Sequence, residues 1–226
     1  MTKHLDRDMD QLHRDILSLC AMVEDMIDRA GVALREGRLD LASQVAEEDR
    51  MVDQREVAIE DECMKMLALH HPVAGDLRRI ATVIKVNNDM ERMADLAVSV
   101  CERAIGVHQC AKFVIPDGVG MMVSRTTQMV RGALDSFVNL DTEAAMKIIK
   151  MDDVVDDLNV QLIAKLEMMM KAEATLVEPS LHCFSAIRHV ERIADLATNI
   201  AEDVIFLVDG EIVRHRGADS PEIHAS

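Results

Sequence analysis

The stretch MERMADLAVSV, residues 90–100, returns with the same pattern as VERIADLATNI at residues 190–200. Glu91 and Asp95 of the first stretch therefore stand 100 positions before Glu191 and Asp195 of the second. Self-similarity at a fixed spacing is typical of a chain built by repetition of one structural unit. The sequence thus indicates a duplicated architecture in which a spaced pair of acids is present in both copies.

The composition favours helices over strands. Of the 226 residues, 49% are hydrophobic but only 2% are aromatic, with no Trp and no Tyr. Strands favour aromatic and β-branched side chains, whereas Leu, Met, Ala, Glu, Lys and Arg favour helix. The 9 glycines and 4 prolines leave few turns, hence few and long elements. We therefore predict an all-α protein.

Apolar residues in the first segment lie alternately four and three positions apart, which predicts a helix with one apolar seam. These residues are Leu5, Met9, Leu12, Ile16, Leu19, Val23, Met26, Ala30 and Leu34. Gly37 ends this helix. We predict a second helix over about 39–70, before Pro72, and a third over about 74–105, ended by Gly106.

The same seam returns after the segment GVHQCAKFVIPDG, residues 106–118. Its members follow the earlier ones at a constant offset of 103, and are Ile115, Val119, Met122, Thr126, Met129, Ala133 and Phe137. They predict a fourth helix. A fifth is expected over about 142–171, capped by Asp141, and a sixth over about 179–208, begun by Pro179 and ended by Gly210.

The chain is thus predicted to be a tandem repeat of two antiparallel three-helix bundles with six long helices. We expect residues 1–107 to form the first repeat, 108–117 a linker, 118–210 the second repeat and 211–226 a C-terminal tail. The six helices could share one core, or two bundles could pack side by side. We favour the second arrangement, with a substantial interface between the halves.

Charge and cysteine usage narrow the class of protein. The formal net charge of −16 predicts no binding to nucleic acid. It suits cations or a basic patch on another protein, or simply serves solubility. The five cysteines include no C-x-x-C, the start of the chain is polar, and no apolar run approaches about 18 residues. We expect a cytoplasmic protein with reduced thiols, no signal peptide and no membrane span.

The second and third helices of each repeat carry acids four residues apart. These eight residues are Asp49, Asp53, Glu91, Asp95, Asp152, Asp156, Glu191 and Asp195. Residues four apart lie on one helix face, where like charges destabilise a helix by about 0.2–0.5 kcal/mol per pair. If the two helices pack side by side, the pairs face one another. Oxygen clusters of that kind suit Mg²⁺, Ca²⁺, Mn²⁺ or iron.

Two other interpretations stay open. Arg92, Arg188 and Arg192 flank the acids, which could form solvated ion pairs worth under about 1 kcal/mol in a plain structural adaptor. The second interpretation is a helical metal-binding or iron-storage bundle. Ferritin-like di-iron sites use Glu-x-x-His, and no Glu in the chain has a His three residues later.

Histidines and a cysteine offer two weaker candidate metal sites. His189 lies close in sequence to Glu191 and could join its cluster. Cys63 stands two turns before the adjacent His70 and His71, which could form a soft site, although adjacent side chains diverge on a helix.

Two long segments resemble the PhoU family of phosphate-uptake regulators. They are GDLRRIATVIKVNNDMERMADLAVSV (75–100) and IRHVERIADLATNIAEDVIFLVDGEIVRH (187–215). The family is similar in having two three-helix repeats, each third helix carrying an E-R-[IM]-x-D-x-A signature. The likeness covers nearly the whole chain and includes the ending VDGEIVRH. Ala94 and Ala194 stand where many relatives place Gly, a change that helices accept.

The resemblance implies a cytoplasmic, usually dimeric, negative regulator of phosphate uptake that is not an enzyme. Proteins like it couple the ATPase subunit of a phosphate ABC transporter to a sensor histidine kinase, and meet the membrane only through such partners. Some relatives bind metal ions through [ED]-x-x-x-D pairs. The resemblance therefore implies that the eight acids named above are candidate metal ligands. The resemblance leaves open whether Fe, Zn, Mn or Mg ions are bound here.

Overall fold

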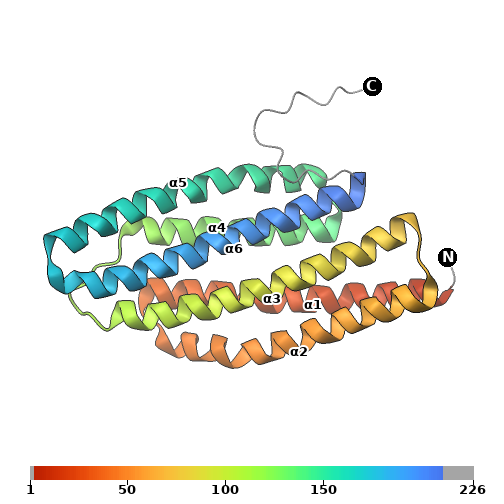
Figure 1. Cartoon of the computed structure of the whole chain (residues 1–226), viewed down its shortest axis with the longest axis horizontal. Helices are drawn as coiled ribbons and strands as arrows, with labels where there is room; N and C mark the ends of the chain where they lie inside the picture. Colours follow the sequence, from red (N-terminus) through yellow and green to blue (C-terminus); the bar gives the residue numbers. More distant parts are fainter. Residues whose placement is uncertain (1–2, 211–226) are drawn as a thin grey trace, which may run out of the picture.

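The structure is a computed structural model that describes residues 3–210 (Figure 1). Its elements are α1 (Lys3–Glu36), α2 (Leu39–His70), α3 (Ala74–His108), α4 (Asp117–Asn139), α5 (Thr142–Ala172), the short 3₁₀ helix η1 (Ala174–Leu176) and α6 (Val177–Asp209). The described residues contain no strand, so the predicted all-α class is confirmed. None of these helices combines the length and the apolar character that a membrane crossing requires.

The helices form two antiparallel three-helix bundles that lie side by side, as expected for the repeat. α1, α2 and α3 contact one another, and so do α4, α5 and α6. The halves meet mainly along α3 and α6, and α1 also contacts α4 behind that seam (Figure 1). Buried apolar side chains from both halves form one continuous core. One face of the molecule thus presents α2, α3, α6 and α5 in that order.

The predicted apolar seams are buried. All seven members of the first seam between Leu12 and Leu34 are in the core, and so are their counterparts from Val119 to Phe137. Ile115 is half-buried and precedes α4. At the start of α5, Asp141 accepts a hydrogen bond of 2.9 Å from the backbone N–H of Ala144, which confirms the predicted cap.

Two helix boundaries differ from the prediction. α3 does not end at Gly106 but continues through it to His108. A Cβ atom at Gly106 would lie 2.5 Å from the ring of His182 on α6, so this glycine permits a close helix approach instead of ending a helix. α6 begins at Val177, two residues before Pro179, which lies within the first turn.

Candidate functional site

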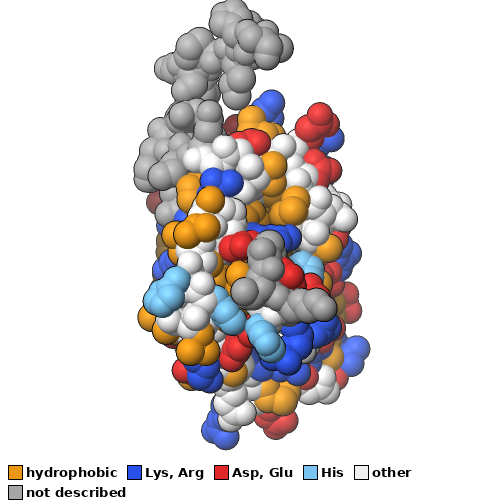
Figure 2. Space-filling model, turned by 90° about the vertical axis from the view of Figure 1, so that its right-hand side faces the viewer, with side chains coloured by type: hydrophobic (Ala, Val, Ile, Leu, Met, Phe, Trp, Pro, Cys, Tyr) orange, Lys and Arg blue, Asp and Glu red, His pale blue; other side chains and the backbone are white. Residues whose placement is uncertain are grey.

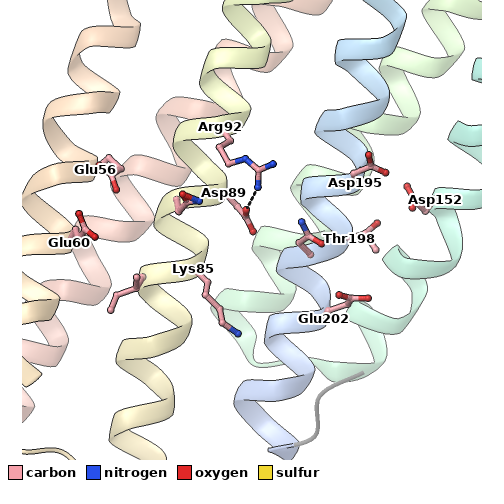
Figure 3. A pocket seen from close by; sticks show the side chains of 12 residues that line it. Glu56, Glu60, Lys85, Asp89, Arg92, Asp152, Asp195, Thr198 and Glu202 are labelled. Carbon is pink, nitrogen blue, oxygen red and sulfur yellow. Dashed lines mark hydrogen bonds and ion pairs between the residues drawn. The ribbon is translucent and has the colours of Figure 1, made fainter. Parts of the chain in front are cut away.

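A groove runs along the seam between α3 and α6 on the four-helix face (Figure 3). It has a volume of about 720 Å³ and reaches from α2 on one side to α5 on the other. Its acidic lining residues are Glu56, Glu60, Asp89, Asp152, Asp195 and Glu202. Lys85 and Arg92 are its basic residues. The groove is therefore strongly acidic, and its acids come from both halves.

Each basic residue of the groove is held by a buried acid. Lys85 Nζ lies 2.9 Å from Asp203 Oδ1, an ion pair that joins α3 to α6, and 4.8 Å from the centre of the Phe206 ring. Arg92 donates a hydrogen bond of 3.4 Å to Asp89 one turn earlier on α3 (Figure 3). These two cations are therefore drawn toward Asp203 and Asp89.

A second cavity of about 460 Å³ lies where α3 and α6 pass one another. Residues at duplicated positions, 100 apart in the sequence, line this cavity from both sides. α3 contributes Arg92, Asp95, Leu96 and Ser99, and α6 contributes Arg192, Asp195, Leu196 and Asn199. The third helices of the two repeats therefore present the same face toward this cavity.

Four of the predicted acids come together between α2 and α3. We call Asp49, Asp53, Glu91 and Asp95 the N-terminal cluster. Burial raises the pKa of Asp49, and the carboxylates of Asp53 and Asp95 raise it further. Burial, Asp95, Glu56, Asp53 and Asp49 raise the pKa of Glu91. Asp53 and Asp95 are exposed, whereas the other two are half-buried.

Glu56 and a buried amide extend the N-terminal cluster along the helix interface. Asn87 of α3 is 1% exposed. Its Nδ2 donates hydrogen bonds to the backbone oxygen of Glu56 (2.9 Å) and to Glu56 Oε1 (3.1 Å). Burial raises the pKa of Glu56, and so do Glu60 and Asp53. Sequence reasoning assigned no role to Asn87, because a lone asparagine in a helix carries no spacing signal.

The other four predicted acids come together between α5 and α6. We call Asp152, Asp156, Glu191 and Asp195 the C-terminal cluster. Burial raises the pKa of Asp152 to about 7, with further contributions from Asp195, Asp156, Asp153 and Glu191. Burial also raises the pKa of Asp195, an effect that Asp156 strengthens.

The C-terminal cluster contains a cation of its own. Arg188 Nη1 lies 2.7 Å from Glu191 Oε1. Arg188 opposes the upward shift that burial gives the pKa of Glu191, and with Arg192 it does the same at Asp195. Asn159 of α5 is buried and donates a hydrogen bond of 3.5 Å to Glu191.

The donor chemistry of both clusters fits a hard cation. Three oxygens are buried without a hydrogen-bond partner among the described residues: Asp49 Oδ1, Asp152 Oδ1 and Glu191 Oε2. Carboxylate oxygens are the ligands that such ions prefer. Within residues 3–210, however, no three His, Cys, Asp or Glu side chains already stand close enough to hold a metal ion. Binding would therefore require the exposed acids to turn inward: Asp53 and Asp95 in the N-terminal cluster, and Asp156 and Asp195 in the C-terminal cluster.

The weaker candidates are placed differently. His189 lines the second cavity with Asp195; its Nε2 lies 3.3 Å from Ser185 Oγ, and burial lowers its pKa. His70 Nε2 lies 3.1 Å from Asp8 Oδ2, and Cys63 is fully buried. His70 is therefore drawn to α1, as the diverging faces of a helix suggest.

One end of the molecule carries basic as well as acidic side chains. Figure 2 looks onto the end where α2 passes into α3 and where α6 ends, and shows His, Lys and Arg side chains beside acidic and hydrophobic ones. His70 and His71 close α2 there, and Arg78 and Arg79 lie in the first turns of α3. Basic and acidic side chains are therefore mixed at this end.

Comparison with known protein families matches the PhoU domain to residues 16–104 and 119–204. A phosphate-specific transport system accessory protein PhoU homolog from Aquifex aeolicus is 35% identical over 94% of this chain and 96% of its own. The Pseudomonas aeruginosa homolog is 34% identical over 96% and 90%. The crystal structure of PhoU from Pseudomonas aeruginosa superimposes with a TM-score of 0.86 at 33% identity, covering 91% of this chain and 99% of that one. The chain belongs to the PhoU family.

Proposed function

We propose that this protein regulates phosphate uptake, as an accessory to a phosphate-specific transport system. The observation that carries the proposal is membership of the PhoU family over both repeats, together with relatives whose names give them that role. The match extends over at least nine-tenths of those relatives' length. The regulation we propose is negative, so that uptake and the phosphate-starvation response are repressed when phosphate is plentiful.

The protein acts by contact rather than by catalysis. The sequence has no glycine-rich phosphate loop and no nucleotide motif. Its distinctive surface is the acidic groove between α3 and α6, which suits basic surfaces on other proteins. The partners we propose are the ATPase subunit of a phosphate ABC transporter and a sensor histidine kinase. The protein would work in the cytoplasm as a homodimer and reach the membrane through these partners.

Cations are part of the proposal. The two carboxylate clusters supply hard oxygen donors, some of them buried without a partner, which supports binding of Mg, Mn, Fe or Zn ions. Burial and repulsion between carboxylates together raise the pKa values of Asp49, Glu91 and Asp152, and a bound cation would offset both. It would also change the charge that the face presents to a partner. The ion therefore has a regulatory role here, not a catalytic one.

Gene deletion in the native host tests the regulatory assignment. Cells lacking the protein and grown in high phosphate should take up more labelled phosphate and express more phosphatase than the parent. The wild-type gene on a plasmid should restore repression. Unchanged uptake and unchanged phosphatase expression in the deletion strain would contradict the proposed function, while leaving the helical architecture untouched.

Charge reversal tests the role of the groove. Glu60→Lys and Glu202→Lys place cations in the groove, and the double variant should lose retention of the transporter ATPase subunit and the kinase in low-salt pull-downs. Glu47→Lys changes an exposed acid of α2 that does not line the groove and serves as the matched control. Equal retention by wild type and the double variant would argue against docking at this face.

A further inference from the structure

A third cavity, of about 210 Å³, lies at the end of the molecule where α6 ends. Its lining is mostly apolar, and both repeats contribute to it. The first repeat supplies Met9 and Leu12 of α1 and Val83 of α3, and the second supplies Phe137 and Val138 of α4 and Leu207 of α6. Leu12, Val83 and Phe137 are buried members of the core, whereas Val138 is 42% exposed. Part of this apolar lining is therefore open to solvent.

Leu140 also lines the cavity, and its backbone conformation is unusual for a leucine. It follows α4 with a φ of +53°, in the left-handed region where glycine or asparagine commonly ends a helix. This conformation disfavours a side chain with a Cβ atom, and apolar burial of that side chain can offset the cost. Yet Leu140 is 42% exposed to solvent in the described part of the chain. The leucine at this position thus calls for a further apolar neighbour.

The chain passes beyond the described residues within one helical turn of this cavity. Leu207 lines the cavity, and Gly210 ends α6 with a φ of +75°, a conformation in which the chain can turn back after a helix. Residues 211–226 lie outside the described part of the chain, and the first apolar ones among them are Ile212 and Val213. An extended chain advances about 3.3 Å per residue, whereas Leu207 is only about 4.5 Å from Gly210 along the helix axis. Both side chains can therefore reach the cavity.

The charges beside these two apolar residues match those of the cavity. The polar residues of the lining are Asp10, His13 and Arg79. Glu211 precedes the apolar pair and Arg214 follows it. Glu211 adjoins Gly210, where a Cβ atom would lie 3.4 Å from Nη1 of Arg78 on α3, so this acid leaves α6 beside cations. Arg214 comes later in the segment and complements Asp10 of α1. Charge and apolar character thus favour the same occupant.

We propose that residues 211–214 fold back into this cavity, with Ile212 and Val213 packed against its apolar lining. The segment then contacts α1 and α3 of the first repeat and α4 and α6 of the second, and so holds the two halves together at this end. It also covers Leu140. This inference concerns how the repeats are joined, so it goes beyond the proposed function and does not depend on it.

Urea unfolding of full-length variants tests the proposal. Ile212→Ser should reduce the equilibrium constant for folding by about tenfold, because burial of one branched aliphatic side chain favours the folded state by about that factor. Ile223→Ser, the same change farther along the tail, is the matched control and should leave the constant unchanged. In a Leu140→Ala background the effect of Ile212→Ser should be smaller, because neighbouring side chains are coupled. Equal effects of the two serine substitutions would overturn the proposal.

Disulfide trapping locates the segment. A Cys110→Ser background leaves only the four buried cysteines of the native chain. In that background, Val138→Cys together with Val213→Cys should form a cross-link within one chain when the folded protein is mildly oxidised. The same pair should react much more slowly in urea, where the cavity is lost.

Val160→Cys is the matched control partner for Val213→Cys. Val160 is 68% exposed on α5. Its neighbour Asn159 contacts Glu191, about 27 Å from the end of α6, which is beyond the reach of residue 213. Equal cross-linking of the two partners would overturn the proposal. So would faster cross-linking to Glu202→Cys in the acidic groove, or cross-links between two chains instead of within one.

Discussion

Arg131 of α4 donates a hydrogen bond of 2.9 Å to Asp28 of α1, the residue 103 positions before it. This spacing equals the offset of the duplication, so the two residues occupy equivalent positions of the two repeats. An acid at both positions would have placed like charges in contact across the two halves. Arginine in the second repeat turns this contact into an ion pair, which Glu24 extends. The halves have therefore diverged where they meet.

The ion pairs that Arg131 and Lys85 form between the halves should differ in strength because they differ in burial. The side chain of Arg131 is 54% exposed, so Arg131→Met should lower the free energy of unfolding by less than about 1 kcal/mol. Asp203 is 2% exposed, so Lys85→Met should cost about 2 kcal/mol by removing an ammonium from a buried carboxylate. Urea unfolding measures both. Equal losses would contradict this ranking.

Close packing of α1 against α4 should make Gly31 sensitive to substitution. A Cβ atom there would lie 2.5 Å from Cγ1 of Val123, a branched side chain with little freedom to move. Gly31→Ala should therefore lower the free energy of unfolding by about 1–3 kcal/mol. Thermal melts should show recovery in the double variant with Val123→Ala.

Gly75 provides the control for this prediction. It lies near the start of α3, and no atom lies within 4 Å of the place where its Cβ would stand. Gly75→Ala should leave stability unchanged or raise it by about 0.5–1 kcal/mol, because alanine favours helix. Destabilisation by both alanines to the same extent would show that helix contact at Gly31 is not the cause.

The sequence was sufficient for the helical architecture because the apolar seams repeat at a fixed offset. Positions such as Leu19 and Met122 are related by that offset, and both are fully buried. The ends of the helices were harder to predict. Gly37 has a φ of +69° and ends α1 as expected, but Gly106 lies inside α3. A glycine that ends a helix and one that admits a neighbouring side chain look alike in one sequence.

The candidate site was predictable only in part, for a similar reason. Spacing alone placed Glu91 and Asp95 on one helix face, and the structure brings Asp49 beside them. Lys85 and Asp203 are 118 positions apart, which is not the offset of the duplication, so no sequence pattern predicts this ion pair. Ion pairs between halves depend on how the bundles dock, and periodicity within one helix carries no information on docking.

The cysteines should be unreactive in the folded protein, with one exception. Burial raises the pKa of the Cys20, Cys63, Cys101 and Cys183 thiols to about 12. Cys110 is only half-buried, in the loop after α3. Because the thiolate is the reactive form, Ellman's reagent should titrate about one thiol in native protein and all five in urea. Cys110→Ser should remove the native reaction, and rapid labelling of two or more thiols would contradict the burial described.

Asp152 should make the metal-free protein less stable as pH rises. Its pKa is about 7 in the folded state against an ordinary value of 3.8, because it is partly buried among other acids. Between these two values the folded protein keeps a proton that the unfolded chain has released. The free energy of unfolding therefore falls as pH increases from about 4 to about 7 and levels off above that range.

Replacing this carboxylate by an amide should remove most of that loss. In EDTA at pH 8, Asp152→Asn should unfold at a higher urea concentration than wild type, with a gain of about 2 kcal/mol after allowance for solvent screening at this partly exposed site. At pH 4 the two proteins should be nearly equal, since the aspartate is then protonated when folded. Asp157→Asn, a change at an exposed acid of the same helix, is the matched control and should shift stability little at either pH. A gain for Asp152→Asn that is as large at pH 4 as at pH 8 would show that the cost of ionising Asp152, partly buried among other acids, is not its origin.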